Sequence, residues 1–491
     1  MIQDKERERD RLIFFFILFS SVLFVYCVSI KNIIHPDVYH FLLYGEAIDK
    51  LGTIPHYSLT SIYPDLKITL QEWFYDIFIY KIFDNFGIFG LIVNQTVMFL
   101  ILSILVYKQL KKRSSSYAYL VFGTMVTMLI FGYSLSIRPI LLTYILLLSE
   151  LIFIEKYAKT NKLIYLISFP ILLIVEMNVH ASYWIFHYLF LLPFLMPGLN
   201  FKRLEIETYE VKRLPLMLMG IFSIPALFLT PYGVDSITYI FKAVFIPMDT
   251  LKIDECQPLP ISSVEFILLT GFLFFFIFLI RKRSINSFDF YFIIGIMLVS
   301  YMMQRNFSFM AFAILIMIEK DTVADFFTNV IDNDETYKKL LSRQRLLKVC
   351  TIVLCVVVAF AFVSNFIHAK RAFVSDCDLQ PFAAIEYMDE HSKSKTVLND
   401  ISAGTHLEYN GYKVLIDYCS ETYAKALNGK YDIAENYANI KTSSKFKEYA
   451  SRCEYALARP GTFLDKRVRK SDKFEEVLDT DFYTLYKNKE F

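Results

Sequence analysis

Long apolar runs separated by short charged breaks constrain this chain more than any other feature. The first run, Leu12 to Ile30, carries no charged residue, and about twenty apolar residues suffice to cross a hydrocarbon core roughly 30 Å thick. Hydrophobic residues make up 55% of the chain and the mean hydropathy is +0.41, whereas soluble domains are about 45–50% apolar. The sequence therefore predicts an integral membrane protein.

The first run has the features of a retained membrane anchor. The basic segment MIQDKERERDR precedes it, and no small-residue cleavage motif follows it. Reading the other apolar runs against charged breaks predicts a polytopic α-helical membrane protein of about eleven transmembrane helices. These lie near residues 12–30, 88–107, 117–135, 140–155, 163–177, 182–197, 214–230, 264–280, 287–303, 307–319 and 347–366.

Basic residues fall on one side of these predicted spans. The connections KERERDR, KQLKKRSSS, EKYAKTNK, FKRLEIETYEVKR, RKRS and KKLLSRQRLLK alternate with connections that hold few Lys or Arg. Cytoplasmic loops carry the excess of Lys and Arg in membrane proteins. We therefore expect a multi-pass protein of the cell (plasma) membrane with a cytoplasmic N-terminus and an external C-terminus. The net charge of +2 is too balanced to indicate a nucleic-acid partner.

The sequence changes character after residue 366. Residues 1–366 hold all of the predicted spans, whereas residues 367–491 are polar, with alternating runs such as KTVLND and helical patterns such as SSKFKEYASRCEYAL. The tail therefore predicts a small external α/β domain of ordinary size. Cys377, Cys419 and Cys453 all lie in it, and three cysteines leave the pairing of any disulfide open.

Polar clusters gather at one end of the predicted spans. Seven of them, HPDVYH, QEWF, IRP, EMNVH, TPYG, DECQP and QRN, fall on the outer side of this topology, while the inner loops hold runs of bases. Ionisable groups near a membrane are costly to bury and usually line a water-filled cavity. The pattern predicts a polar cavity at the outer leaflet, framed by many helix ends.

The first external loop, residues 31–87, predicts two interfacial helices. The stretch YHFLLYGEAIDKLG has an amphipathic helical pattern that ends at Gly52. The stretch FYDIFIYKIFDNFG is apolar but too short to span a membrane. Asp37 opens the first helix, and Glu72 with Trp73 opens the second, where the helix dipole favours a carboxylate.

This order of features resembles the GT-C superfamily of integral-membrane glycosyltransferases. The stretch PDVYHFLLYGEAIDKLGTIPHYSLTS, followed by QEWF, is similar to the first loop of uncharacterised bacterial GT-C-like proteins. The likeness continues at Arg138–Pro139, Asn178–His180, Pro231–Gly233, Asp254–Glu255 and Arg305–Asn306, and in the tail at GTHLEYNGYKVLIDYCSETY, so it covers nearly the whole chain. The chain departs from the pattern at Val38, where many relatives carry a second acid.

The resemblance implies an inverting glycosyltransferase that moves a sugar from a polyprenyl-phosphate carrier to an external cell-envelope acceptor, which is a glycan, lipid or protein. Asp37 would be the general base for the acceptor hydroxyl, a role that typically contributes about 10²–10⁴-fold in rate. The leaving phosphate would need a cation, for which Arg138 and Arg305 are the candidates. The other expected substrate-binding residues are His40, Glu72, Trp73, Asn178, His180, Tyr232, Glu255 and Asn306.

The same residues also have structural interpretations. Asp37 can be a helix N-cap, and His40 can be a structural hydrogen-bond partner. Arg138 can be a snorkelling side chain. Glu72 and Trp73 can anchor the membrane interface. Substrate contact and these structural roles therefore remain alternatives at each position.

The remaining alternatives concern the tail and the class of protein. The turn at Tyr232 can simply break a helix, and Asp417 and Glu421 are expected to be structural or to contact the acceptor. No cofactor is expected, and no metal site, because the outer acids are scattered without paired-ligand spacing. A transporter would show paired broken helices in repeated halves, which the sequence lacks. A non-catalytic GT-C-like assembly or binding protein is the other alternative.

Overall fold

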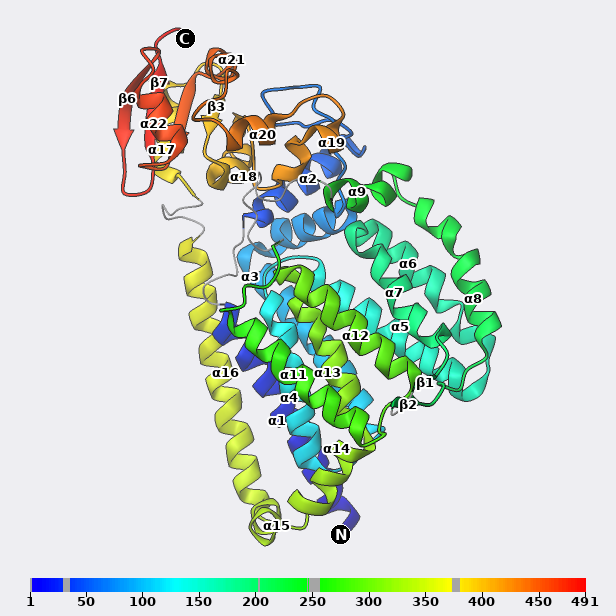
Figure 1. Ribbon diagram of the computed structural model, residues 1–491. Coiled ribbons are helices and arrows are strands. Elements are labelled where there is room, and N and C mark those ends of the chain that lie inside the picture. Colours follow the sequence, from blue (N-terminus) through cyan, green and yellow to red (C-terminus); the bar gives the residue numbers. More distant parts are fainter. Residues whose placement is uncertain (1, 30–35, 202–203, 245, 247–256, 373–379) are drawn as a thin grey trace.

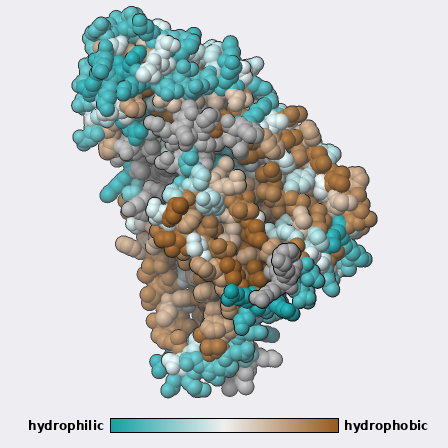
Figure 2. All heavy atoms as spheres, viewed as in Figure 1, coloured by the Kyte–Doolittle hydropathy of each residue, from teal (hydrophilic) through white to brown (hydrophobic). Residues whose placement is uncertain are grey.

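A computed structural model describes residues 2–29, 36–201, 204–244, 246, 257–372 and 380–491. Its helices form a bundle with the N-terminus at one end and a smaller α/β part with the C-terminus at the other (Figure 1). Figure 2 shows a hydrophobic band over the bundle between hydrophilic surfaces at the two ends. An apolar band of this kind is what hydrocarbon requires of a protein surface. The chain is therefore a membrane protein.

Four described helices are long and apolar enough to cross a membrane. Two of the candidate spans are whole helices, namely α3 (Trp73–Lys111) and α11 (Val264–Arg281). The other two are Glu6–Cys27 in α1 (Ile2–Ser29) and Gln344–Arg371 in α16 (Gln344–Ala372). Helices α1 and α16 lie side by side along the bundle (Figure 1). They connect the end that holds the N-terminus with the end near the α/β part.

The other bundle helices are shorter or more polar. They are α4 (Tyr117–Phe131), α5 (Ile140–Thr160), α6 (Ser168–Val179), α7 (Trp184–Leu195), α8 (Arg213–Phe222), α9 (Val234–Val244), α12 (Ser287–Met302), α13 (Met310–Ile318), α14 (Asp321–Phe326) and α15 (Glu335–Ser342). Short 3₁₀ segments join several of them, namely η1 (Gly132–Ser134), η2 (Leu163–Tyr165), η3 (Ala181–Tyr183), η4 (Ile224–Phe228) and η6 (Gln304–Phe309). A short antiparallel pair, β1 (Leu199–Phe201) and β2 (Leu204–Ile206), lies between α7 and α8.

The expected number of about eleven spans is not confirmed. Among the described residues, six further apolar stretches are shorter than the four candidates. Helices α6 and α7 have 12 residues each, and such a helix rises only about 18 Å. His180 separates them with non-helical backbone angles, φ −157° and ψ 62°. Apolar composition alone does not show where such breaks fall.

The described part of the first loop begins with helix α2 (Asp37–Leu51), which packs against α3. Pro36 stands at the N-cap position, and Gly52 ends the helix in a left-handed conformation with φ 65°, donating its N–H to Ile48 O. Glycine has no Cβ to oppose that conformation. Gly87 also has a positive φ, inside α3, where φ 58° and ψ −151° are non-helical and kink the helix.

The C-terminal part contains a mixed five-stranded sheet in the order β4-β3-β5-β7-β6. The strands are β3 (Thr396–Asn399), β4 (Lys413–Val414), β5 (Tyr455–Ala458), β6 (Phe474–Asp479) and β7 (Thr484–Asn488). Strand β3 pairs in parallel with β4 and β5, while β7 pairs antiparallel with β5 and β6. The helices of this part are α17 (Phe382–His391), α18 (Gly404–Tyr409), α19 (Lys425–Asn428), α20 (Ile433–Ala438), α21 (Phe446–Arg452) and α22 (Phe463–Arg469), with 3₁₀ turns η8 (Ile401–Ala403) and η9 (Ser420–Tyr423).

The loop between α2 and α3 joins the edge of this sheet. Val414 in β4 donates its N–H to Thr60 O (2.8 Å) and accepts from Ile62 N–H (3.0 Å). Ile62 and Leu66 are buried in the same apolar cluster as Leu398 and Leu415 of the C-terminal part. The core of the C-terminal part therefore includes residues from the first external loop, which composition could not predict.

Candidate functional site

A cavity of about 1130 Å³ lies where the first loop, the ends of the bundle helices and the C-terminal part meet. Its wall from residues 1–366 includes Asp37, His40, Glu72, Arg138, His180 and Arg305. Its wall from the C-terminal part includes Asp400, Asp417, Glu421, Tyr423 and Arg459. The structure therefore brings together six of the predicted catalytic and substrate-binding residues, from five separate polar clusters, with Asp417 and Glu421 of the tail.

Asp37 and Arg138 form an ion pair in the cavity wall. Arg138 Nε donates to Asp37 Oδ2 at 2.7 Å, and the two side chains are 24% and 18% exposed. Asp37 is the first residue of α2, while Arg138 precedes Pro139, the N-cap of α5. Pro36, not Asp37, is the N-cap residue of α2, and no side chain caps this helix end. A charge-assisted hydrogen bond of this kind fixes the orientation of the carboxylate.

Glu72 precedes α3 and lies close to Arg138 and Arg305. Burial raises the pKa of its carboxyl to about 8, and the charges of Asp37 and Glu421 act in the same direction. Arg138 and Arg305 oppose this rise in pKa. At neutral pH the fold therefore favours a protonated Glu72, which can donate a hydrogen bond.

His180 is held by a chain of hydrogen bonds that begins in the cavity wall. Thr143 donates its only hydroxyl proton to Glu176 Oε1 (2.7 Å), and its oxygen lies 2.9 Å from His180 Nδ1. Because that proton is already used, His180 Nδ1 must be the donor to Thr143. This leaves His180 Nε2 as an acceptor, 3.8 Å from Glu72 Oε1.

A second buried pair, His187 and Glu150, lies beside Glu176 in the helix bundle, and sequence reasoning missed it. His187 Nδ1 lies 2.5 Å from Glu150 Oε2, and His187 Nε2 lies 3.6 Å from Glu176 Oε2. All three side chains are at most 1% exposed. The signal that could have found Glu150 and His187 is their position inside apolar runs, since ionisable residues at membrane depth are rare and usually functional.

Trp73 and Asn178 do not line the cavity. Trp73 Nε1 donates to Asn178 Oδ1 (3.1 Å), and Asn178 Nδ2 donates to Leu229 O (2.8 Å). These bonds tie the start of α3 to the end of α6 and to the segment after η4. A substrate contact by either residue stays a prediction, and the observed bonds are structural.

Two other predicted residues also lie away from the described cavity wall. Tyr232 donates its hydroxyl to Pro55 O (2.7 Å) and is buried in a small apolar cluster. Asn306 is buried, and its carbonyl accepts from the hydroxyl of Ser300 (3.2 Å). Glu255 lies outside the described residues.

Asp400, Arg459 and Tyr239 also line the cavity, and sequence reasoning did not include them. Arg459 forms an ion pair with Asp400 (3.2 Å), and both line the cavity. Tyr239 in α9 donates its hydroxyl to Glu421 (3.2 Å) across the cavity wall. Asp400 and Arg459 directly follow strands β3 and β5, and Tyr239 lies within α9, so no local pattern distinguishes them.

Neither protein-family models nor curated proteins match this sequence. Among solved structures, the chain is similar to the oligosaccharyltransferase of Archaeoglobus fulgidus in its apo form, with a TM-score of 0.50 and 11% sequence identity. The similarity covers 90% of this chain and 69% of the archaeal protein. At that identity the two proteins share a fold, and residue roles do not carry over.

Proposed function

We propose that this chain is a GT-C-type membrane glycosyltransferase that moves a sugar from a polyprenyl-phosphate carrier to a cell-envelope glycan, lipid or protein. The observation that carries the proposal is the cavity, in which Asp37 lies among Arg138, Arg305 and Glu72. The fold shared with an oligosaccharyltransferase supports the same class of protein. A multi-pass location in the cell membrane, with the C-terminal part outside, is part of this proposal.

In the proposed reaction, Asp37 takes the proton of an acceptor hydroxyl while the oxygen of that hydroxyl attacks the anomeric carbon of the sugar. The new C–O bond forms on the face opposite the carrier, so the configuration inverts. The bond between that carbon and the phosphate oxygen breaks, and polyprenyl phosphate leaves with the electron pair. A cationic side chain stabilises the charge on the leaving phosphate.

Arg305 is a candidate for that phosphate. Arg138 already pairs with Asp37 at 2.7 Å, and its role in the proposal is to orient the base. Arg305 lines the same cavity from η6, and a guanidinium matches the geometry of a phosphate. The proton held by Glu72 is available to a sugar or acceptor oxygen near His180.

Replacing Arg305 with alanine is expected to raise the KM for the lipid-linked donor by about 10–100-fold, the size of a lost hydrogen bond to a charged group. Arg305→Lys should recover part of that loss, since it keeps the charge without the fork geometry. The measurement is donor-dependent initial rate in vesicles. An unchanged donor KM in Arg305→Ala would remove Arg305 from the phosphate site.

The activity is expected to fall at alkaline pH because Glu72 ionises. Its pKa is raised to about 8, so the protonated form dominates below that pH and the charged form above it. A second negative charge beside Asp37 repels the donor phosphate, and kcat/KM should fall about tenfold per pH unit above the pKa. In Glu72→Gln this alkaline decline should disappear. If the alkaline decline in kcat/KM persists unchanged in Glu72→Gln, a group other than Glu72 causes it.

The proposed function is tested with the purified chain in lipid vesicles, a panel of radiolabelled polyprenyl-phosphate sugars and an envelope acceptor fraction. Transfer of label with inversion at the anomeric carbon and release of polyprenyl phosphate would support it. Movement of a labelled lipid or solute across the vesicle membrane without transfer would favour a transporter. Binding of the donor without turnover would favour a non-catalytic assembly protein.

A further inference from the structure

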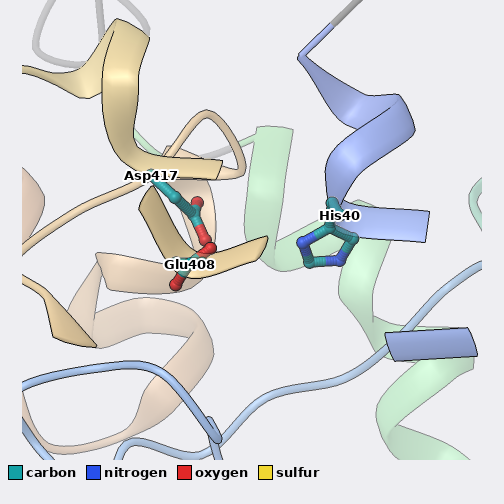
Figure 3. A group of neighbouring side chains, drawn as sticks. All are labelled: His40, Glu408 and Asp417. Carbon is teal, nitrogen blue, oxygen red and sulfur yellow. The ribbon is translucent and has the colours of Figure 1, made fainter. Parts of the chain in front are cut away.

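Three potential metal-binding side chains meet where α2 touches the C-terminal part. They are His40 in α2, Glu408 in α18 and Asp417, which follows β4. One ligand atom of each lies within 4.8 Å of those of the other two. Figure 3 shows the carboxyl groups of Glu408 and Asp417 facing each other, with the imidazole ring of His40 across from them.

The two carboxyl groups are buried without a cationic partner among the described residues. Glu408 is 1% exposed and Asp417 is 4% exposed. Glu408 accepts from the Thr60 hydroxyl (2.7 Å), while Asp417 accepts from the backbone of Cys419 (2.7 Å). Burying a charge without a partner costs several kcal/mol. The pair therefore requires either a bound proton or a bound cation.

Two buried atoms of this group have no hydrogen-bond partner in the described part of the chain. They are Nδ1 of His40 and Oε2 of Glu408. Buried polar atoms are normally satisfied by protein or by a bound species. A proton shared between Glu408 and Asp417 would satisfy the carboxyl oxygens but would leave His40 Nδ1 unpaired. A cation between the three side chains would satisfy the carboxyl oxygens and one imidazole nitrogen together.

We propose that His40, Glu408 and Asp417 bind a divalent transition-metal cation. One imidazole nitrogen and two carboxylate oxygens suit Mn²⁺ or Zn²⁺. Ligand atoms about 2.0–2.2 Å from such a cation lie roughly 3–4 Å from one another, so small side-chain rotations suffice to close the present spacing. His40 and Asp417 also line the cavity, which places the remaining coordination positions on the cavity side.

The cation would link the C-terminal part to α2, the helix that begins with Asp37. His40 follows Asp37 by three residues in α2, so the two share one face of the helix. Glu408 and Asp417 belong to the C-terminal part, which also pairs with the first external loop at Val414. Binding would therefore order the wall of the cavity. The inference does not depend on glycosyl transfer, since it concerns metal binding alone.

The test uses the full-length chain in detergent or nanodiscs after removal of metals with a chelator. Mn²⁺ is titrated by electron paramagnetic resonance, and Zn²⁺ content is measured by elemental mass spectrometry. One cation per chain is expected. Because even the loss of a supporting residue around a metal site costs about 10–100-fold in affinity, His40→Gln and Glu408→Gln should each weaken binding by at least about 100-fold. Asp49→Asn, at an exposed carboxylate of the same helix α2 that pairs with Lys81, should change the affinity by less than about threefold.

A second measurement needs no variant. In the native chain, adding Mn²⁺ should slow hydrogen exchange at the amides of α2 and α18 relative to the metal-free protein. Failure of both metals to bind at one per chain would overturn the proposal and leave a proton shared by the two carboxyl groups. Metal binding that persists at native affinity in both variants would also overturn it. So would a rate of amide hydrogen exchange in α2 and α18 that is the same with and without the metal.

Discussion

Replacing Asp37 with asparagine is expected to lower the rate of sugar transfer by about 10²–10⁴-fold, the usual contribution of a general base. Asparagine keeps the shape of the side chain but cannot take a proton. It also removes the charge that pairs with Arg138 at 2.7 Å. The measurement is the initial rate of transfer in vesicles containing equal amounts of native and variant protein.

Asp49 provides the matched control in the same helix. Its carboxylate pairs with Lys81 at 2.7 Å. The Asp49 side chain is 35% exposed and the Lys81 side chain 48%. Surface ion pairs of this kind contribute little, so Asp49→Asn should keep the native rate. If Asp37→Asn also kept the native rate, the assignment of the base would be wrong and a binding or assembly role would fit better.

Replacing His187 with leucine is expected to destabilise the helix bundle by about 3–5 kcal/mol, because one partner of a buried charged group is lost. His187 lies between Glu150 and Glu176, and all three side chains are almost completely buried. Without the imidazole, two carboxyl groups remain in an apolar surrounding. The measurement is the midpoint of unfolding in mixed detergent micelles.

Neutralising the whole group is the control for that prediction. The triple variant His187→Leu, Glu150→Gln and Glu176→Gln should recover most of the lost stability, since replacing every charge of a buried group is often close to neutral. His391, which is exposed in α17, serves as a single-site control. An unchanged unfolding midpoint in His187→Leu would show that the buried group does not hold the bundle together.

Local signals in the sequence predicted both ends of α2, the helix that begins with Asp37. Pro36 and Gly52 mark the two ends of α2, because proline suits a helix start and glycine adopts the left-handed conformation that ends one. Asp37, Arg138 and Arg305 each stand at a helix end on the side predicted to be external. Helix ends on one side of a bundle converge, and these three residues line the same cavity.

The rest of the site depends on contacts that no local pattern encodes. Thr60 and Glu408 are hydrogen-bonded although 348 residues separate them. The packing of α18 on α2, which places Glu408 and Asp417 beside His40, follows from the way the first loop joins the sheet. The expectation that the outer acids are scattered came from sequence spacing, whereas the fold gathers two of them around one histidine. Trp73 and Asn178 matched the sequence pattern equally well, yet they bond to each other outside the cavity wall.

The most direct test of the proposed function is mass spectrometry of the envelope glycans, lipids and proteins of the source organism after deletion of the gene. We predict that one glycan class loses a sugar residue of defined mass and that the native gene restores it. Asp37→Asn, present in the membrane at the native level, should not restore it. An envelope whose glycans are unchanged by the deletion, or are fully restored by Asp37→Asn, would contradict a glycosyltransferase that uses Asp37 as its base.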